Sequence, residues 1–391
     1  MMISRRNFLA VAGAAAAAAA LTACGGSSSS TSTASSAASS SAASAGSEAA
    51  GKITKVALTC DTGTIDDESF NQACWTAVSG YMGDDCQYYI PEADASDEDR
   101  ETMIRQAVND GAEVIVCVGY LYGASLAWAA EQYPDVKFIA IDVTQGDIGT
   151  DAIPANCYCI TFKEEQAGYL AGYAITKDGK NKLGFLGGMA VPAVIRYGYG
   201  FVQGCNDAGK AMNDEVTVEY VYGNKFAGTP EITAYMDTWY QEKGVQVVFA
   251  CGGGIYTSAT EAAKKANGKV IGVDTDQAVT INKLGTEGMT VTSAMKGLGA
   301  TVKATLKDVI ENGNWANYGG KIATLGLVSG DDPELNYVQI PMESTQWTDN
   351  FTKDDYKALV KSMFDGTVKV SDDTSAMPAH NIIVNEYDNI M

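Results

Sequence analysis

Three aspartates in this chain of 391 residues each come at the end of a run of apolar, strand-forming residues. They are Asp61, Asp142 and Asp274, and the glycine pair Gly252-Gly253 follows a fourth such run. In open α/β sheets, ligands collect outside the carboxyl ends of the strands, so we expect these positions to converge on one binding pocket. A single aspartate at such a place more commonly caps a helix or forms a turn.

The stretch DTGTIDDESFNQACW (61–75) places Phe70 among carboxylates and amides. A phenylalanine in so polar a turn can serve as a flat platform on which a planar ligand stacks. It can also pack against the first turn of the following helix as a hydrophobic staple. The first interpretation gives Phe70 a role in binding, and the second gives it a role in stability.

Composition argues against several kinds of site and partner. The formal net charge is −21 at pH 7, and so acidic a surface repels phosphate backbones, so we expect no nucleic-acid partner. The single histidine, His380, argues against a histidine-based metal centre or catalytic triad. The nine cysteines form no CxxC pair, and buried thiols are the expected state, although an exported location permits disulfides. No segment fits a phosphate-binding loop, and we expect no cofactor and no metal.

Short apolar runs alternate with amphipathic segments along most of the chain. The segments DRETMIRQAVNDG (99–111), SATEAAKKANG (258–268) and TVKATLKDVIENG (301–313) indicate helices. Continuous apolar strands that alternate with helices are typical of parallel sheets covered on both faces. The strands are predicted at 55–60, 113–118, 137–142, 158–162, 182–188, 216–222, 245–251, 269–274 and 289–295.

One internal repeat indicates a duplicated lobe. GAEVIVCVGYLYGASLAWAAEQYPDVKFIAID (111–142) aligns with GVQVVFACGGGIYTSATEAAKKANGKVIGVD (244–274). Each copy has a strand, a glycine turn, a helix and a second strand that ends in aspartate. Two unrelated βαβ units would also show some likeness, but the matching glycines and aspartates favour duplication. Two similar α/β lobes with a cleft between them are therefore expected.

The first 24 residues, MMISRRNFLAVAGAAAAAAALTAC, have the order of an export signal. Leu-Thr-Ala-Cys resembles a bacterial lipobox, which would make Cys24 the lipidated first residue of the mature protein. A transmembrane anchor is the alternative, but the apolar run (8–23) is shorter than the roughly 18 residues that a span needs. The Ser- and Ala-rich residues 25–52 are predicted to form a flexible tether, which would hold the globular part at the extracytoplasmic face of the cell membrane.

Several motifs together resemble the basic membrane protein family, the substrate-binding lipoproteins of ABC importers, which includes purine nucleoside receptors. The resemblance covers about residues 53–330 and rests on DTGTIDDESFNQACW (61–75), FKEEQAGYLAGYAI (162–175), LGFLGGMAVPAVIRYGYGFVQG (183–204), VVFACGGG (247–254), IGVDTDQ (271–277) and VTSAMK (291–296).

The family has the periplasmic-binding-protein type I fold, in which two Rossmann-like lobes are joined by a three-segment hinge and the ligand lies in the cleft. The resemblance implies crossovers near 162–165, 293–296 and 326. The expected lobe boundaries are 53–163 plus 297–325 for lobe 1 and 164–296 plus 326–391 for lobe 2.

The resemblance also implies which aromatic residues bind the ligand. In nucleoside-binding members, the base lies between two aromatic rings. Matched by motif, one ring is Phe70, with Asn71 beside it. The second is Phe226 in YGNKFAGTP, and Tyr222 is the alternative.

The same resemblance implies which polar residues contact the ligand. Asp61 falls at a base-contacting position, and Asp142 corresponds to a further acid near the base. Asp274 corresponds to the ribose-binding acid, and Lys296 to the lysine that contacts the sugar. A carboxylate can accept hydrogen bonds from both hydroxyls of a ribose, and such charge-assisted bonds are about twice as strong as neutral ones. Lys296 would partly neutralise Asp274.

The expected protein is therefore a monomeric binding protein, and not an enzyme, that captures a nucleoside, with a purine expected, and delivers it to the permease of an ABC importer. Three other functions stay open. The pocket could hold another planar heterocycle, such as a flavin. Its paired acids could serve an enzyme that acts on nucleosides. The chain could also be a surface adhesin or a signalling lipoprotein.

Overall fold

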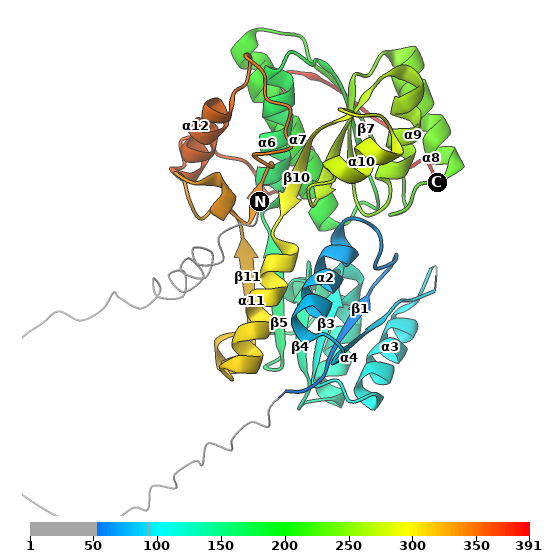
Figure 1. Cartoon of the computed structure of the whole chain (residues 1–391), viewed down its shortest axis with the longest axis vertical. Coiled ribbons are helices and arrows are strands. Elements are labelled where there is room, and N and C mark those ends of the chain that lie inside the picture. The colour runs from blue at the N-terminus through cyan, green and yellow to red at the C-terminus, as the bar shows by residue number, and fades with distance from the viewer. Residues whose placement is uncertain (1–52, 93) are drawn as a thin grey trace, which may run out of the picture. The chain divides into compact units, whose positions relative to one another are not determined.

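The computed structural model describes residues 53–92 and 94–391 (Figure 1). The predicted signal peptide, the lipidation site at Cys24 and the tether lie outside the described residues. The described chain forms two largely parallel β-sheets whose strands alternate with helices. The predicted α/β fold class is confirmed.

The first sheet has six strands in the order β11-β5-β4-β3-β1-β2, and all of its strand pairs are parallel. Two of its central strands, with the sequences VALTC and VIVCV, are buried along their whole length, as expected for a sheet covered on both faces. The strands are β1 (Val56–Cys60), β2 (Cys86–Tyr89), β3 (Val114–Val118), β4 (Lys137–Ile141), β5 (Cys157–Phe162) and β11 (Lys321–Leu325).

The second sheet has seven strands in the order β12-β10-β9-β8-β6-β7-β13. Only the edge pair of β12 with β10 is antiparallel. The strands are β6 (Lys182–Gly187), β7 (Thr217–Tyr222), β8 (Val247–Cys251), β9 (Lys269–Asp274), β10 (Thr290–Lys296), β12 (Val338–Gln339) and β13 (Ile383–Glu386).

The helices connect these strands, and the three helices predicted from amphipathic spacing are confirmed as α3, α9 and α11. The helices are α2 (Phe70–Met82), α3 (Asp97–Asn109), α4 (Gly123–Gln132), α5 (Gln145–Ile148), α6 (Glu164–Lys177), α7 (Pro192–Met212), α8 (Pro230–Thr238), α9 (Tyr256–Ala266), α10 (Ala278–Leu284), α11 (Leu298–Glu311) and α12 (Lys353–Phe364). Short 3₁₀ turns lie at Tyr120–Tyr122, Trp315–Asn317 and Pro333–Leu335, and one π-helical turn lies at Trp239–Lys243.

The two sheets repeat one topology. The order β2-β1-β3-β4-β5 in the first sheet has the same form as β7-β6-β8-β9-β10 in the second. The internal repeat of the sequence therefore covers equivalent units, β3-α4-β4 and β8-α9-β9. Both sheets bring the carboxyl ends of their central parallel strands to one edge, where ligands bind in folds of this kind.

The chain passes between the sheets at three places: from β5 to β6, from β10 to β11, and from β11 to β12. Helix α11 follows β10 and packs against α2, which follows β1 of the first sheet (Figure 1). Residues Ile53–Met391 nevertheless form one compact unit. The residue boundaries of the lobes stay a prediction.

Four strands were not predicted from the sequence. They are β2, β11, β12 and β13, which are short or only partly buried, so they lack the continuous apolar run by which the other strands were recognised. The eight cysteines of the described chain are all free thiols, and only Cys86 is not buried. Within residues 53–92 and 94–391, no helix combines the length and the apolar character that a membrane span requires.

Candidate ligand-binding site

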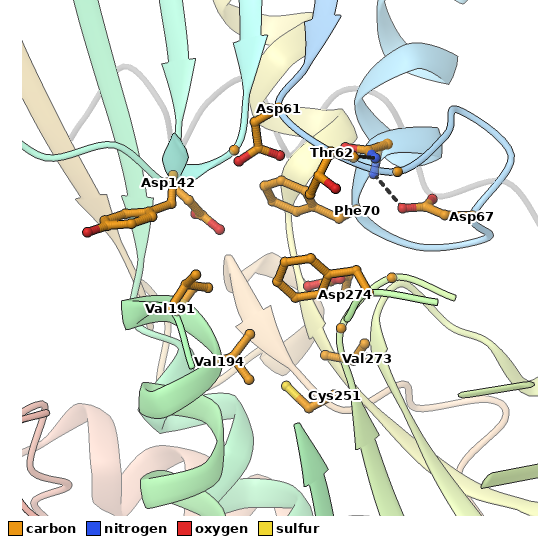
Figure 2. Close-up of a pocket in the computed structure, with 18 of the residues that line it drawn as sticks. Asp61, Thr62, Asp67, Phe70, Asp142, Val191, Val194, Cys251, Val273 and Asp274 are labelled. Carbon is orange, nitrogen blue, oxygen red and sulfur yellow. Dashed lines mark hydrogen bonds between the residues drawn. The ribbon is translucent and has the colours of Figure 1, made fainter. Parts of the chain in front are cut away.

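A pocket lies between the strand ends of the two sheets. Figure 2 shows Asp61 and Asp142 pointing into it from one side and Val191, Val194, Cys251 and Val273 approaching from the other. Every pocket residue that the sequence predicted is in its lining: Asp61, Phe70, Asn71, Asp142, Phe226, Gly252, Gly253, Asp274 and Lys296. Segments far apart in the sequence therefore meet in one cavity.

The two aspartates of the internal repeat share an unusual backbone conformation. The φ angles are 61° at Asp142 and 64° at Asp274, in the left-handed region that few residues other than glycine adopt. Strain of this kind is characteristic of functional sites, where the surrounding structure must hold it. The two residues have equivalent positions in the two sheets, share one backbone conformation, and both line the pocket. Helix caps or turn formers in two unrelated units would not be expected to agree in all three respects.

The glycines of the repeat make room for pocket side chains. A Cβ atom on Gly119 would lie 2.1 Å from the carboxylate of Asp61, and one on Gly252 would lie 2.8 Å from the ring of Phe226. Both glycines also have positive φ angles, 119° and 132°, which side-chain-bearing residues rarely adopt. Each copy of the repeat thus uses its glycine to admit one residue that lines the pocket.

Lys296, the last residue of β10, lies in a cluster of carboxylates at the back of the pocket. Its ammonium nitrogen lies 2.5 Å from Asp142, 3.2 Å from Glu164 and 3.9 Å from Asp274. All four side chains are almost completely buried. Lys296 was expected to neutralise Asp274, but its shortest contact is with Asp142. The difference arises because β10 ends where α6 and the end of β4 approach, which the sequence pattern does not reveal.

Burial and charge oppose each other in this cluster. Burial disfavours the charged form of Lys296, but the surrounding carboxylates outweigh that effect and raise the pKa of the ammonium group. Burial raises the pKa of Asp142 and of Asp274, and Lys296 acts in the opposite direction on both. Lys296, together with Arg196 beside Glu164, therefore keeps a group of acids ionisable in a place that water barely reaches.

Glu164 is held in this cluster by a close helix pair. It begins α6 and accepts a 2.6 Å hydrogen bond from Arg196 on α7. The two helices approach so closely because glycines face the partner backbone. A Cβ atom on Gly168 or Gly200 would lie 2.1 Å from a carbonyl oxygen of the other helix. The motifs FKEEQAGYLAGYAI and VPAVIRYGYG were part of the family resemblance, and this packing explains why they carry so many small residues.

Asp61 is held at the pocket wall by the first sheet. Its Oδ2 accepts a 2.9 Å hydrogen bond from the backbone N–H of Leu121, in the turn that follows β3. Burial raises the pKa of its carboxyl group to about 7, although the Leu121 N–H acts in the opposite direction. Near neutral pH this residue can therefore be present as an acceptor-only carboxylate or as a carboxylic acid that donates one hydrogen bond.

Asp67 is a pocket residue that the sequence analysis missed. Its carboxylate accepts hydrogen bonds from the backbone N–H groups of Ser69, Asn71 and Gln72, so it caps the start of α2 and lines the pocket as well. Burial raises the pKa of this carboxyl group to about 6. The double acid Asp66-Asp67 in the quoted stretch was the available signal, but nothing in the sequence indicates which of the two faces inward.

Phe70 is the first residue of α2, and its half-buried ring serves two environments. One is the pocket, whose lining includes it; the other is the main hydrophobic core, against which it packs. The ammonium group of Lys296 lies 4.6 Å from the centre of its ring, within the range of a cation–π interaction. Geometry thus admits both the stacking role and the packing role.

Two buried oxygen atoms of the site have no hydrogen-bond partner among the described residues: Oδ1 of Asn71 and Oδ1 of Asp142. The orientation of the Asn71 amide is fixed, because its nitrogen donates a 2.9 Å hydrogen bond to the carbonyl oxygen of Thr62. Buried polar atoms are rarely left unpaired, so each of these oxygens is available to accept a hydrogen bond from a ligand or from water.

Phe226 lines the pocket, whereas Tyr222 does not. The Tyr222 hydroxyl lies 2.9 Å from that of Tyr220, and its ring packs against Phe185. The Phe226 ring lies over Gly188 and Gly252, where a Cβ atom would lie 2.4 Å and 2.8 Å from it. Of the two aromatic candidates, Phe226 is therefore the one in a position to contact a ligand in this pocket.

The rim of the pocket joins segments that belong to different sheets. Ser69 donates a 2.7 Å hydrogen bond to Oδ2 of Asp274. The carbonyl oxygen of Glu68 accepts hydrogen bonds from the side chains of Thr275 and Gln277. The segment before α2 is thus hydrogen-bonded to the end of β9 and the turn after it.

Two α/β sheets of one topology, three connections between them and a pocket at their facing strand ends define the periplasmic-binding-protein type I fold. A solute-binding protein from Aeropyrum pernix has this fold, with a TM-score of 0.62 and 21% identity over 81% of this chain and 87% of that one.

Within this class, the chain belongs to the Bmp family, described as ABC transporter substrate-binding protein PnrA-like, which matches residues 53–370. A relative from Listeria innocua, the CD4+ T-cell-stimulating antigen, is 31% identical over 64% of this chain and 72% of its own length. The ABC transporter nucleoside-binding protein BmpA of Lactococcus lactis is 27% identical over 73% of this chain and 83% of its own length. The predicted family is confirmed.

Replacing Lys296 with Met should destabilise the fold strongly, because it leaves Asp142, Glu164 and Asp274 buried without their shared cation. The expected loss in the free energy of unfolding at pH 7.5 is about 3–5 kcal/mol, measured by chemical denaturation. A carboxyl group with a raised pKa in the folded state takes up a proton on folding, so stability rises as the pH falls toward the unfolded value of about 4. Lys296 acts to lower the pKa of Asp142 and Asp274, so its removal raises both pKa values further, and the deficit of the variant should be smaller at pH 5.

The matched control is Lys303→Met, because Lys303 is exposed on α11. The free energy of unfolding of this variant should lie within about 0.5 kcal/mol of that of the unaltered protein, as is usual for surface substitutions. Equal small losses for both lysines at pH 7.5, or a deficit of Lys296→Met that grows at pH 5, would contradict the role assigned to the carboxylate cluster.

Proposed function

We propose that this protein is a lipid-anchored binding protein of the extracytoplasmic face that captures a purine nucleoside and delivers it to the permease of an ABC importer. The observation that supports this most is the composition of the pocket, which combines the aromatic rings of Phe70 and Phe226 with buried, partly unpaired oxygen acceptors. A nucleoside joins a flat heterocycle, which stacks on rings, to a diol, which donates hydrogen bonds.

The charge of the pocket favours a neutral ligand with many donors. Four aspartates line it, Asp61, Asp67, Asp142 and Asp274, together with one lysine that is already paired. A ligand phosphate would be placed among these carboxylates, so the site should reject nucleotides. The relative from Lactococcus lactis, named a nucleoside-binding protein, supports the same ligand class.

Asp274 is the proposed ribose acceptor. Its Oδ2 accepts a hydrogen bond from Ser69, and its Oδ1 lies 3.5 Å from the hydroxyl of Tyr197. A carboxylate has about four acceptor positions, so capacity for ligand hydroxyls remains. Loss of this carboxylate should leave Lys296 paired, because Asp142 and Glu164 lie closer to it than Asp274 does.

Isothermal titration calorimetry with inosine, hypoxanthine and inosine monophosphate tests this proposal. We expect inosine to bind, the free base to bind more weakly, the nucleotide not to bind, and inosine to be recovered unchanged, as for a binding protein. In Asp274→Asn, affinity for inosine should fall by about 10- to 100-fold, as for loss of a charged acceptor, while affinity for the base changes little.

The control for that experiment is Asp276→Asn. Asp276 lies in the same turn, but it is exposed, and its carboxylate accepts a hydrogen bond from the backbone N–H of Ala278 at the start of α10. It should bind like the unaltered protein. Equal losses for base and nucleoside in Asp274→Asn would remove Asp274 from the ribose role. Binding of the monophosphate as tightly as inosine would contradict the proposed ligand class.

Variants of Phe70 distinguish stacking on a ligand from packing against the core. Phe70→Leu keeps a similar apolar volume and should cost less than about 1.5 kcal/mol of stability. It removes the flat ring, so affinity for a purine nucleoside should fall by about two- to tenfold, and Phe70→Ala should lower it further. If Phe70 only packs against the core, Phe70→Ala will lower the melting temperature markedly and the folded fraction will keep its affinity. Melting and titration of both variants distinguish these cases.

The lipid anchor belongs to the same proposal. Cys24 lies outside the described residues, and the support for its lipidation is the Leu-Thr-Ala-Cys sequence before a Ser- and Ala-rich segment. When the Cys24→Ala variant is expressed in a bacterium with the lipoprotein pathway, it should be absent from the membrane fraction, because a covalent lipid supplies the membrane affinity. Its affinity for inosine should be unchanged. Equal retention of both forms in the membrane fraction would exclude anchoring through Cys24.

A further inference from the structure

Residues 371–391 lie beyond the segment that matches the Bmp family, which ends at residue 370. Part of this segment forms β13, which adds an edge strand to the second sheet, parallel to β7. Because the pairing is parallel, the residues after β13 emerge at the same edge of the sheet as the end of β7. This is the edge at which the pocket lies, and β7 leads directly into the loop that carries Phe226.

A buried polar group fastens this segment to the sheet. Glu219 of β7 is buried, and its carboxylate accepts hydrogen bonds from Tyr387, from Lys243 at 3.0 Å and from Asn385 at 3.1 Å. The ammonium group of Lys243 also lies 4.6 Å from the centre of the Tyr387 ring. The position of Tyr387, the first residue after β13, is thus determined by several interactions at once.

Residues 388–391 then flank the loop between β7 and α8. The backbone N–H of Ile390 donates a 3.0 Å hydrogen bond to the carbonyl oxygen of Tyr222, and the side chain of Ile390 packs against the second sheet's core. The side-chain amide of Asn224 donates to the main-chain oxygen of Met391 at 3.3 Å. The hydroxyl of Thr229 lies 3.6 Å from the sulfur of Met391.

These contacts lie on both sides of Phe226 along the chain, since Tyr222 and Asn224 precede it and Thr229 follows it. On its inner side the loop is bonded to the turn after β8, where the N–H of Gly254 donates a 2.7 Å hydrogen bond to the carbonyl oxygen of Phe226. The loop therefore lies between the Gly254 turn and residues 388–391. Figure 1 shows the chain end C beside α8, the helix that follows this loop.

We infer that residues 388–391 act as a strap that fixes the Phe226 loop and so preorganises the aromatic wall of the pocket. The inference rests on the proposed function, because it assumes that Phe226 contacts the ligand. A loop already held in its binding geometry loses less conformational entropy when the ligand arrives, and this raises affinity without any new ligand contact. Asn224, Ile390 and Met391 are positioning residues in this account, since none of them lines the pocket.

Ending the full chain at Tyr387 tests the strap, because it keeps β13 and the bonds to Glu219. In calorimetry with inosine, the truncated protein should bind about three- to tenfold more weakly, as expected for loss of preorganisation alone. Phe226→Leu should cost less affinity in the truncated protein than in the full chain, because the two changes act on one wall. Hydrogen exchange should accelerate in residues 223–229 and stay unchanged in β8 and β9.

Two further variants complete the test. Asn224→Asp keeps a residue that tolerates its φ angle of 58° but removes the donor to Met391, so it should reproduce part of the loss even if the truncated protein fails to fold. Asp388→Asn is the matched control, because Asp388 is exposed in the same segment and should bind inosine normally.

The outcomes separate the strap from the proposed function. If truncation and Asn224→Asp leave inosine affinity unchanged while Phe226→Leu lowers it, the pocket proposal stands and the strap is excluded. If no nucleoside binds to the full chain, the proposed function fails, and hydrogen exchange decides on the strap: faster exchange confined to 223–229 supports it, and unchanged exchange overturns it.

Discussion

The contact between Lys296 and its three carboxylates is the interaction on which the rest of the site depends. Asp142 directly follows β4 of the first sheet, Asp274 ends β9 of the second, and Glu164 begins α6, the helix between β5 and β6. One buried ammonium group therefore bonds to both halves of the pocket. Without it, the acids that suit a donor-rich ligand would repel one another in a place where water cannot screen them.

Most of the fold could be predicted from the sequence, because buried parallel strands are continuous apolar runs and the internal repeat gives their equivalence. The matching glycines and aspartates of the repeat proved to share backbone conformations as well as positions, as at Asp142 and Asp274. The edge strands could not be predicted in this way. Strand β13, for example, has only four residues and a half-exposed pattern, and its place beside β7 depends on the Glu219 contacts, which are distant in sequence.

The candidate site was predictable residue by residue where a strand end or a family motif marked it, but the pairing within it was not. Strand ends indicate where Asp61, Asp142 and Asp274 lie. They do not indicate which acid lies closest to Lys296, because that depends on how α6 and the end of β4 approach the end of β10. Asp67 was missed for a related reason: its role as the cap of α2 and its place in the pocket appear only when the turn is folded.

The central claim is that the pocket between the two sheets holds a purine nucleoside. Native mass spectrometry of the full chain, purified without added ligand and then supplied with inosine or guanosine, tests it most directly. The account predicts one bound molecule with the mass of a purine nucleoside, present after purification or acquired on addition, and released when the protein is denatured. A protein that carries a flavin or another compound through purification, or that gains no mass with either nucleoside, would contradict it.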